Sequence, residues 1–230
     1  MRNPRLTFKS LKEQVYDYLR LQLRRGRLKP GEEIKMEETA QSLGISKTPL
    51  RDALLQLAME NFVTIKPRRG VIVNPLTLEE IKNAYEVIGA LESLAILRAG
   101  PSISEKDLET MLKLVEGMKK ALSRDDFDTY YERNLEFHNV YLSRCHNPEL
   151  NRIVNTLKKR LYDFPRQPAY IREWEEASIR EHEHLLGFLQ RKDYEAAARF
   201  IRDVHWSFEV QKSYILKYYP VEKTATGGEL

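Results

Sequence analysis

Three of the five histidines are spaced so that they can face the interior of a helical bundle. The five are His138, His146, His182, His184 and His205. His138, His182 and His205 each fall on the apolar stripe of a different predicted helix, whereas His184 falls on a polar side and His146 in a break. Three imidazoles and an oxygen ligand that meet in a bundle would suit a divalent transition metal. Periodicity supports equally well three separate core histidines, each bonded to its own acceptor.

A second group of residues has the chemistry for nucleic acid. In GISKTPLRDALLQLAMENFV (44–63) the leucines share one side of a predicted helix, and the opposite side of its first turns carries Ser46, Lys47, Thr48 and Arg51. Lysine and arginine reach guanine O6 and N7, and hydroxyls bond bases or phosphate oxygens. A helix N-terminus also favours phosphate. Any one of these residues alone is more simply a solvated surface group, so the prediction depends on where the chain places them together.

The surrounding elements predict a winged helix-turn-helix. A helix in 11–28 is followed by the turn KPGEE, a short helix over 36–43, a left-handed turn at Gly44 and a helix capped by Ser46. FVTIKPRRGVIVNP (62–75) then reads as a hairpin. This order puts the face of the third helix towards a major groove. The hairpin tip, made of Arg68, Arg69 and Gly70, is expected to touch the DNA backbone or the minor groove.

The remainder of the chain predicts an all-helical bundle. Nearly every segment from Leu78 to Tyr218 shows a 3.6-residue period, with helices expected near 78–99, 104–122, 125–144, 148–162, 170–190 and 193–217. The fold class is therefore mainly α, with one small hairpin. We expect a DNA-binding domain at 1–75, a helical domain at 76–220 and a flexible tail at 221–230.

Charge and composition narrow the class of protein. Residues 1–75 hold 15 Lys and Arg against 8 Asp and Glu, a balance of +7, whereas the whole chain of 230 residues carries +4. A basic N-terminal third on an acidic remainder fits a polyanion-binding module, although a solvated charged surface would look the same. There is one cysteine, no apolar run long enough to span a bilayer and no apolar stretch in MRNPRLTFKS. These features predict a cytoplasmic protein with no membrane association.

The N-terminal third resembles a known family. The G-x-L-x-P-G turn, LGISKTPLRDAL and PRRGVIV occur in order over about 65 residues, and this pattern is similar to the DNA-binding domain of the GntR superfamily of bacterial transcription regulators. The resemblance implies DNA contacts by Ser46, Lys47, Thr48, Arg51, Arg69 and Gly70. Lys47 stands where the family usually has arginine, which replaces a planar fork by a point charge.

The bundle resembles the effector domain of the FCD branch of the same superfamily. The similarity lies in NLEFHNVYLSRCHNPEL, SIREHEHLLGFLQRKDYEAA and the later His205. It implies a metal, zinc or nickel, held by Asn134, His138, His182 and His205. Asn134 replaces the frequent Asp, so we expect weaker metal binding. The separation of His182 from His205 is one residue longer than the resemblance to the family leads us to expect. The last helix should therefore start later or carry a bulge. His205 is the least secure of the four ligands.

The resemblance also implies a small carboxylate effector. Ile88 stands where many members have an arginine that meets the acid, so another cation must serve, with Arg133 or Arg160 as candidates and a structural salt bridge as the alternative for each. The function expected is a metabolite-responsive repressor that binds operator DNA as a homodimer and changes its DNA affinity when the acid binds at the metal.

Two other classes of function share some of these sequence features. A metal-dependent hydrolase with an appended nucleic-acid domain shares the histidines, but no general base is placed beside them and no HExxH, P-loop or GxSxG pattern occurs. Glu181 precedes His182 and so points about 100° away on a helix. A structural nucleoid protein would not need clustered histidines. The sequence thus favours a regulator that is not an enzyme.

Overall fold

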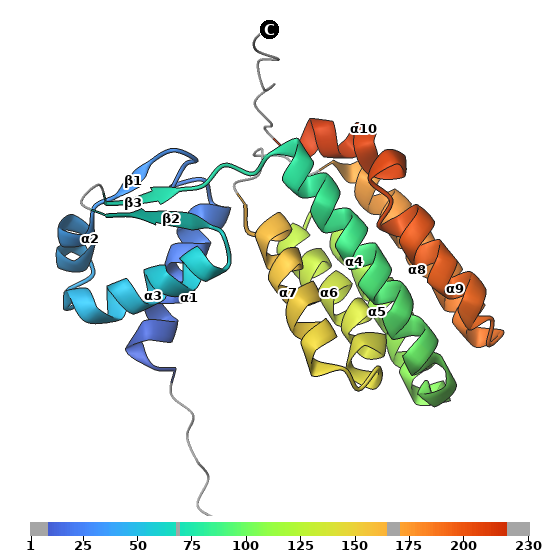
Figure 1. Cartoon of the computed structure of the whole chain (residues 1–230). Coiled ribbons are helices and arrows are strands. Elements are labelled where there is room, and N and C mark those ends of the chain that lie inside the picture. Colours follow the sequence, from blue (N-terminus) through green and yellow to red (C-terminus); the bar gives the residue numbers. More distant parts are fainter. Residues whose placement is uncertain (1–8, 68–69, 165–170, 220–230) are drawn as a thin grey trace, which may run out of the picture. The chain divides into compact units, whose positions relative to one another are not determined.

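The computed structural model describes residues 9–67, 70–164 and 171–219. The chain divides into two compact units (Figure 1). The first consists of the described residues within 1–76 and 159–166, and the second of those within 77–158 and 167–230. In the part of the chain that the structure describes, no helix combines the length and apolar character needed to cross a bilayer.

The first unit contains three helices, α1 (Leu11–Arg24), α2 (Met36–Ser42) and α3 (Lys47–Met59). Ser10 and Glu13 form a capping box at the start of α1. Gly44 has a φ of +65°, as predicted, and turns the chain between α2 and α3. Ser46 occupies the N-cap position of α3, but its side chain makes no capping bond to the described backbone, contrary to the expected cap.

The small sheet has three strands where the sequence predicted two. β2 (Val63–Lys66) and β3 (Gly70–Val73) form the predicted hairpin, with Val63 opposite Val73 and Ile65 opposite Val71. β1 (Glu33–Ile34) adds to the other edge of β3, giving the antiparallel order β1-β3-β2. A strand of two residues is too short to show an alternating pattern, so the sequence KPGEE predicts only a turn.

The core of the first unit explains the exposed face of α3. Leu50, Ala53, Leu54 and Leu57 are each 0% exposed and pack with the buried residues of α1 and the sheet. Each buried leucine of this kind stabilises the unit by about 1.5–3 kcal/mol. Since this apolar stripe fixes the rotation of α3 about its axis, the polar residues of its first turns are held in solvent.

The second unit is entirely helical within its described residues. Its elements are α4 (Leu78–Ala99), a 3₁₀ turn (Gly100–Ser102), α5 (Glu105–Leu122), α6 (Phe127–Arg144), α7 (Pro148–Tyr162, whose residues from Lys159 belong to the first unit), α8 (Arg172–Gln190), α9 (Tyr194–Phe200), a π-helical turn (Ile201–His205) and α10 (Phe208–Tyr218). α5 packs on α6 and α8, and α4 packs on α6 and α9. Together with the first unit, these elements confirm the predicted fold class.

The helix expected over 193–217 is divided by the π-helical turn. In this turn the Trp206 N–H donates to the Ile201 carbonyl at 2.9 Å, and Ser207 caps α10. A π turn holds one more residue than an α turn, so it absorbs the extra residue that the sequence placed between His182 and His205. Of the two alternatives offered from the sequence, the bulge is the one found.

Candidate metal centre and DNA-binding face

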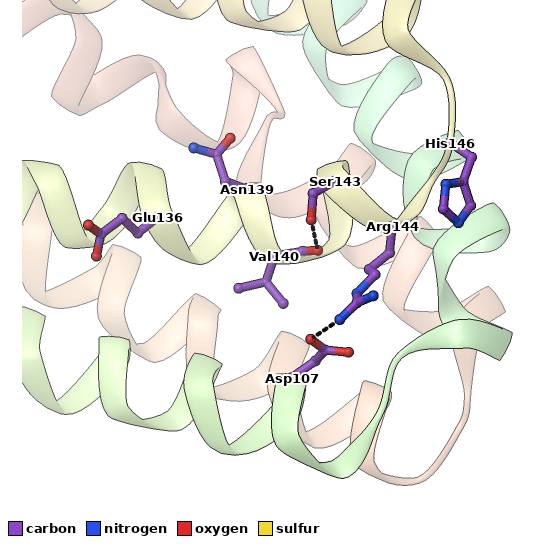
Figure 2. A pocket seen from close by; sticks show the side chains of 7 residues that line it. All are labelled: Asp107, Glu136, Asn139, Val140, Ser143, Arg144 and His146. Carbon is purple, nitrogen blue, oxygen red and sulfur yellow. Dashed lines mark hydrogen bonds and ion pairs between the residues drawn. The ribbon is translucent and has the colours of Figure 1, made fainter. Parts of the chain in front are cut away.

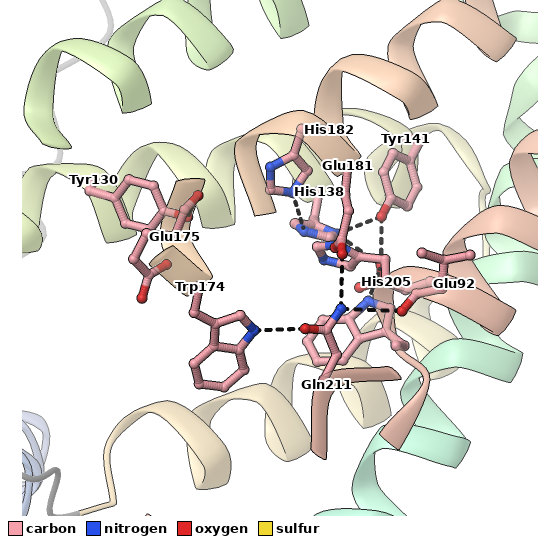
Figure 3. A network of polar contacts seen from close by, with 12 residues as sticks. Glu92, Tyr130, His138, Tyr141, Trp174, Glu175, Glu181, His182, His205 and Gln211 are labelled. Carbon is pink, nitrogen blue, oxygen red and sulfur yellow. Dashed lines mark hydrogen bonds and ion pairs between the residues drawn. The ribbon is translucent and has the colours of Figure 1, made fainter. Parts of the chain in front are cut away.

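The histidine cluster is assembled from three separate elements. His138 comes from α6, His182 from α8 and His205 from the π-helical turn, and one nitrogen of each lies within 4.8 Å of the others (Figure 3). His138 and His182 are fully buried, and the side chain of His205 is 9% exposed. The structure therefore brings together the three histidines that the sequence selected, whereas His184 is exposed and lies outside the cluster.

Glu92 of α4 orients His138. One oxygen of its carboxylate lies 2.8 Å from Nδ1 of His138, and the same oxygen accepts the Trp206 indole N–H at 2.9 Å and the Tyr141 hydroxyl at 2.5 Å. Its other oxygen forms an ion pair with Lys158. Because an ionised carboxylate only accepts, Nδ1 of His138 carries the hydrogen and Nε2 presents its lone pair to the cluster.

Glu181 of α8 orients His205 through a chain of hydrogen bonds whose direction is fixed. The indole N–H of Trp174 can only donate, and it does so to the Gln211 side-chain carbonyl at 2.8 Å. The Gln211 amide nitrogen therefore donates to Glu181 at 2.9 Å, and the other Glu181 oxygen lies 2.7 Å from Nδ1 of His205. His205 is thereby held with Nε2 free to act as a ligand, in the carboxylate–histidine arrangement common at metal sites.

The four residues expected to bind metal fit that role. Nε2 of His138 lies 3.1 Å from Nε2 of His182. When two imidazoles bind one ion with metal–nitrogen distances of about 2.0–2.1 Å and tetrahedral or octahedral angles, their ligand nitrogens are roughly 2.9–3.4 Å apart. The observed distance falls within this range. Oδ1 of Asn134 and Nδ1 of His182 are buried without a hydrogen-bond partner among the described residues. Asn134 lies one helical turn before His138 on α6. Three imidazole nitrogens and one amide oxygen suit ions such as zinc or nickel.

Burial also gives the histidines the protonation state that a metal requires. It lowers the pKa of His138 to about 4 and that of His182 well below its usual range. Burial alone would raise the pKa of the Glu92 carboxyl, but its contacts with His138 and Lys158 hold that pKa well below the usual range. Near neutral pH both imidazoles are therefore uncharged, as metal ligation needs.

The two arginines suggested as partners for a carboxylate are engaged elsewhere. Arg133 is partly exposed and pairs with Glu136 at 2.5 Å. Arg160 belongs to the first unit, where its guanidinium donates to the Pro75 carbonyl at 2.6 Å. The cation that the structure places at the histidine network is Lys158.

No functional role was predicted from the sequence for five residues of this network: Glu92, Lys158, Tyr141, Trp206 and Gln211. A signal for two of them is present. Glu92 follows Ile88 and precedes Ile96 by four residues each, and Lys158 follows Val154 by four, so both charged residues occupy core positions of their helices. A charged residue in an apolar stripe indicates a buried partner.

A separate depression lies on the surface of the second unit (Figure 2). It is open to solvent and is lined by Asp107, Glu136, Asn139, Val140, Ser143, Arg144 and His146. Arg144 spans it to reach Asp107 at 2.9 Å. This depression contains none of the three clustered histidines, so we do not assign the metal to it.

The face of α3 that the sequence selected for DNA is exposed. Ser46, Lys47, Thr48 and Arg51 all lie in solvent on its first turns. Nζ of Lys47 pairs with a carboxylate oxygen of Glu37, from the first turn of α2, at 2.6 Å. Arg68 and Arg69 lie outside the described residues. Gly70 has a φ of +82°, a backbone conformation that residues with a side chain rarely adopt, so this position of the hairpin favours glycine.

Two family models match the chain. The family model described as bacterial regulatory proteins, gntR family, matches residues 11–73, and the FCD domain model matches residues 83–205. The chain is 28% identical to an uncharacterized HTH-type transcriptional regulator of Bacillus subtilis, YdhC, over 82% of this chain and 84% of that protein. It is 23% identical to the HTH-type transcriptional repressor RspR of Escherichia coli, over 81% and 82% of the two chains.

A solved structure is also similar. Escherichia coli McbR/YncC superposes with a TM-score of 0.64 at 26% identity, covering 91% of this chain and 97% of that one. The matched domains and relatives are transcription regulators, not enzymes. The chain belongs to the GntR family of bacterial transcription regulators and carries the FCD domain of one of its branches.

Proposed function

We propose that the protein is a metabolite-responsive repressor that binds operator DNA as a homodimer and senses a small carboxylate at a metal centre in its helical unit. The observation that carries the proposal is the pairing of an exposed cationic helix face in one unit with a buried, pre-oriented histidine cluster in the other. Repressors among the relatives support the direction of regulation. Operator DNA as the target also implies a cytoplasmic location.

The DNA contact is assigned to α3 and the hairpin. Lys47 and Arg51 reach base edges or phosphates, Ser46 and Thr48 bond the backbone, and the hairpin tip at Arg68, Arg69 and Gly70 approaches the duplex beside them. Two such helices, one from each protomer, address two half-sites one helical turn apart. The hydroxyl of Ser46 makes no capping bond to the described backbone, which leaves it available for such a contact.

The sensing site is assigned to Asn134, His138, His182 and His205. These residues would hold a zinc or nickel ion, which would offer open coordination positions to a carboxylate. The protein's own part is to keep His138 and His182 neutral through burial, and to fix the rotation of His138 and His205 through Glu92 and Glu181. An acid that binds one arrangement of the domains more tightly than another shifts DNA affinity by that difference.

DNA binding and sensing are tested in sequence. Duplexes selected from a random pool are titrated by fluorescence anisotropy, and Lys47→Ala and Arg51→Ala should each weaken binding about tenfold and lower its salt dependence. Lys113→Ala on α5 removes one exposed charge from the other unit and should leave affinity unchanged. A screen of small organic acids on the zinc-loaded protein then identifies binders by thermal shift. If no binder alters the affinity for the selected duplex, the sensing proposal fails while the DNA-binding assignment stands.

A further inference from the structure

The four residues assigned to the metal are all uncharged. Asn134 contributes a neutral amide oxygen, and His138, His182 and His205 contribute neutral imidazole nitrogens. A divalent ion held by these ligands keeps its full charge in a site where His138 and His182 are 0% exposed and Asn134 is 6% exposed. Charge that is buried without compensation is strongly unfavourable. The surrounding groups decide whether that charge is offset.

The buried carboxylate that contacts His138 does not offset the charge of such an ion. Glu92 is paired with the ammonium group of Lys158, and both side chains are buried, at 0% and 3% exposed. The ionised carboxylate and the ammonium group together carry no net charge. Glu92 therefore orients His138 but supplies no net negative charge to an ion in the cluster.

Glu181 supplies one negative charge. Its two oxygens accept from the Gln211 amide and face Nδ1 of His205, which is the pattern of an ionised carboxylate. Its side chain is 14% exposed, and no buried cation contacts it among the described residues. Glu181 therefore offsets one of the two positive charges of a divalent ion, and the second remains.

We infer that the metal and a carboxylate ligand bind this site cooperatively, because the carboxylate supplies the one negative charge that the neutral ligand set lacks. The inference rests on the proposed metal centre. A single carboxylate brings the buried centre to neutrality, so each ligand raises the affinity of the other by the same factor. Metal occupancy then reports the acid, and the protein without the acid holds its metal weakly.

The chain offers a direct test of the charge argument. Asn134→Asp places a carboxylate among the ligands and should supply the missing charge permanently. Asn139→Asp is a matched control, because Asn139 lies on the same helix but on the exposed side, where it lines the depression of Figure 2. Both variants add the same charge to α6, so a difference between them reflects position alone.

The measurement is the dissociation constant for zinc, obtained by competition with a chromophoric chelator at constant pH and ionic strength, with increasing acetate. Acetate is used as the probe because it is a small ligand that carries a single carboxylate. Dye calibrations with the same acetate series correct for zinc bound by acetate in solution. In the wild-type protein, saturating acetate should lower the dissociation constant at least about fivefold. Asn134→Asp should bind zinc at least about tenfold more tightly without acetate and should lose the acetate dependence.

Four results would overturn the inference. Wild-type protein that binds zinc equally well at every acetate concentration would show that the charge is offset elsewhere. An acetate dependence that persists in Asn134→Asp, or a tightening that Asn139→Asp reproduces, would show that the missing charge is not located at the ligands. The fourth result is that neither wild type nor Asn134→Asp binds zinc under any condition, although circular dichroism shows that both are folded. In that case the assignment of a metal centre is wrong, and the proposed sensing function fails with it.

Discussion

Nε2 of His138 and Nε2 of His182 lie 3.1 Å apart in the interior of the second unit, and only one of them can carry a hydrogen. Because Glu92 holds the hydrogen of His138 on Nδ1, His182 must be the donor in this pair when no ion is bound. If His138 and His182 both hold a metal through these nitrogens, the hydrogen bond between them would be lost and Nε2 of His182 would have to release its hydrogen.

Zinc should therefore stabilise the wild-type protein, raising its Tm by several degrees at a concentration well above the dissociation constant. His182→Ala should abolish this increase, since the cluster keeps only two imidazoles. His184→Ala, two residues along α8 on an exposed face, should preserve it. The quantity compared is the zinc-induced change in Tm, measured against EDTA for each variant. An equal change in His182→Ala and wild type would exclude the cluster as the zinc site.

The metal-free protein should lose stability as the pH falls from about 6.5 to about 4. The pKa of His138 is lowered to about 4 by burial, whereas an unfolded histidine titrates near 6.5, so the unfolded state binds more protons in this window. By pH 5, the protonation of His138 in the unfolded state should lower the free energy of unfolding by about 2 kcal/mol. Urea unfolding in EDTA at pH 7 and pH 5 measures it. His138→Gln should show a pH-dependent loss smaller by that amount, and an unchanged loss would contradict the prediction.

The ion pair of Glu92 and Lys158 should contribute little net stability but be costly to break. Glu92→Gln leaves a buried ammonium without its partner, and the free energy of unfolding should fall by about 3–5 kcal/mol. Lys158→Met leaves the carboxylate unpaired and should cost a similar amount. The double variant should recover most of either loss in chemical denaturation. If the two single losses instead add in the double variant, the two side chains are not coupled.

Glu37 should restrain the DNA affinity of α3. Its carboxylate pairs with Nζ of Lys47, and contacts with DNA would have to replace that pair. Glu37→Gln should therefore tighten binding to a random duplex several-fold at low salt, and the gain should shrink as salt is raised. Glu38→Gln removes the same charge from the next residue, which pairs with Lys35 instead, and serves as the control. Equal tightening by both variants would mean that net charge alone is responsible.

The parts of the fold that were predicted correctly are those with a strong periodic signal. The stripe of Leu50, Leu54 and Leu57 fixed the rotation of α3, and the apolar neighbours of His138 and His182 pointed these residues inward. Both features repeat along a helix, so sequence alone reveals them.

The missed parts depend on contacts between distant segments. β1 is only two residues long, and Glu92 meets Lys158 from a helix more than sixty positions away in the chain. Helical geometry predicts that Glu181 points away from His182, its neighbour in the sequence, and this is correct. It reaches His205 because the π-helical turn brings that residue beside α8. No local pattern encodes which of several partners a buried charge will find.

The protein contains two tryptophans, and each donates its indole hydrogen into the polar network around the histidines. Trp206 bonds directly to the carboxylate that holds His138, and Trp174 bonds through Gln211 to the one that holds His205. The intrinsic tryptophan fluorescence of the protein is therefore a label-free optical probe of the histidine cluster, with one indole linked to His138 through Glu92 and the other to His205 through Gln211 and Glu181. Replacing either tryptophan by phenylalanine leaves a single tryptophan, so the surroundings of His138 and of His205 can be followed separately in solution.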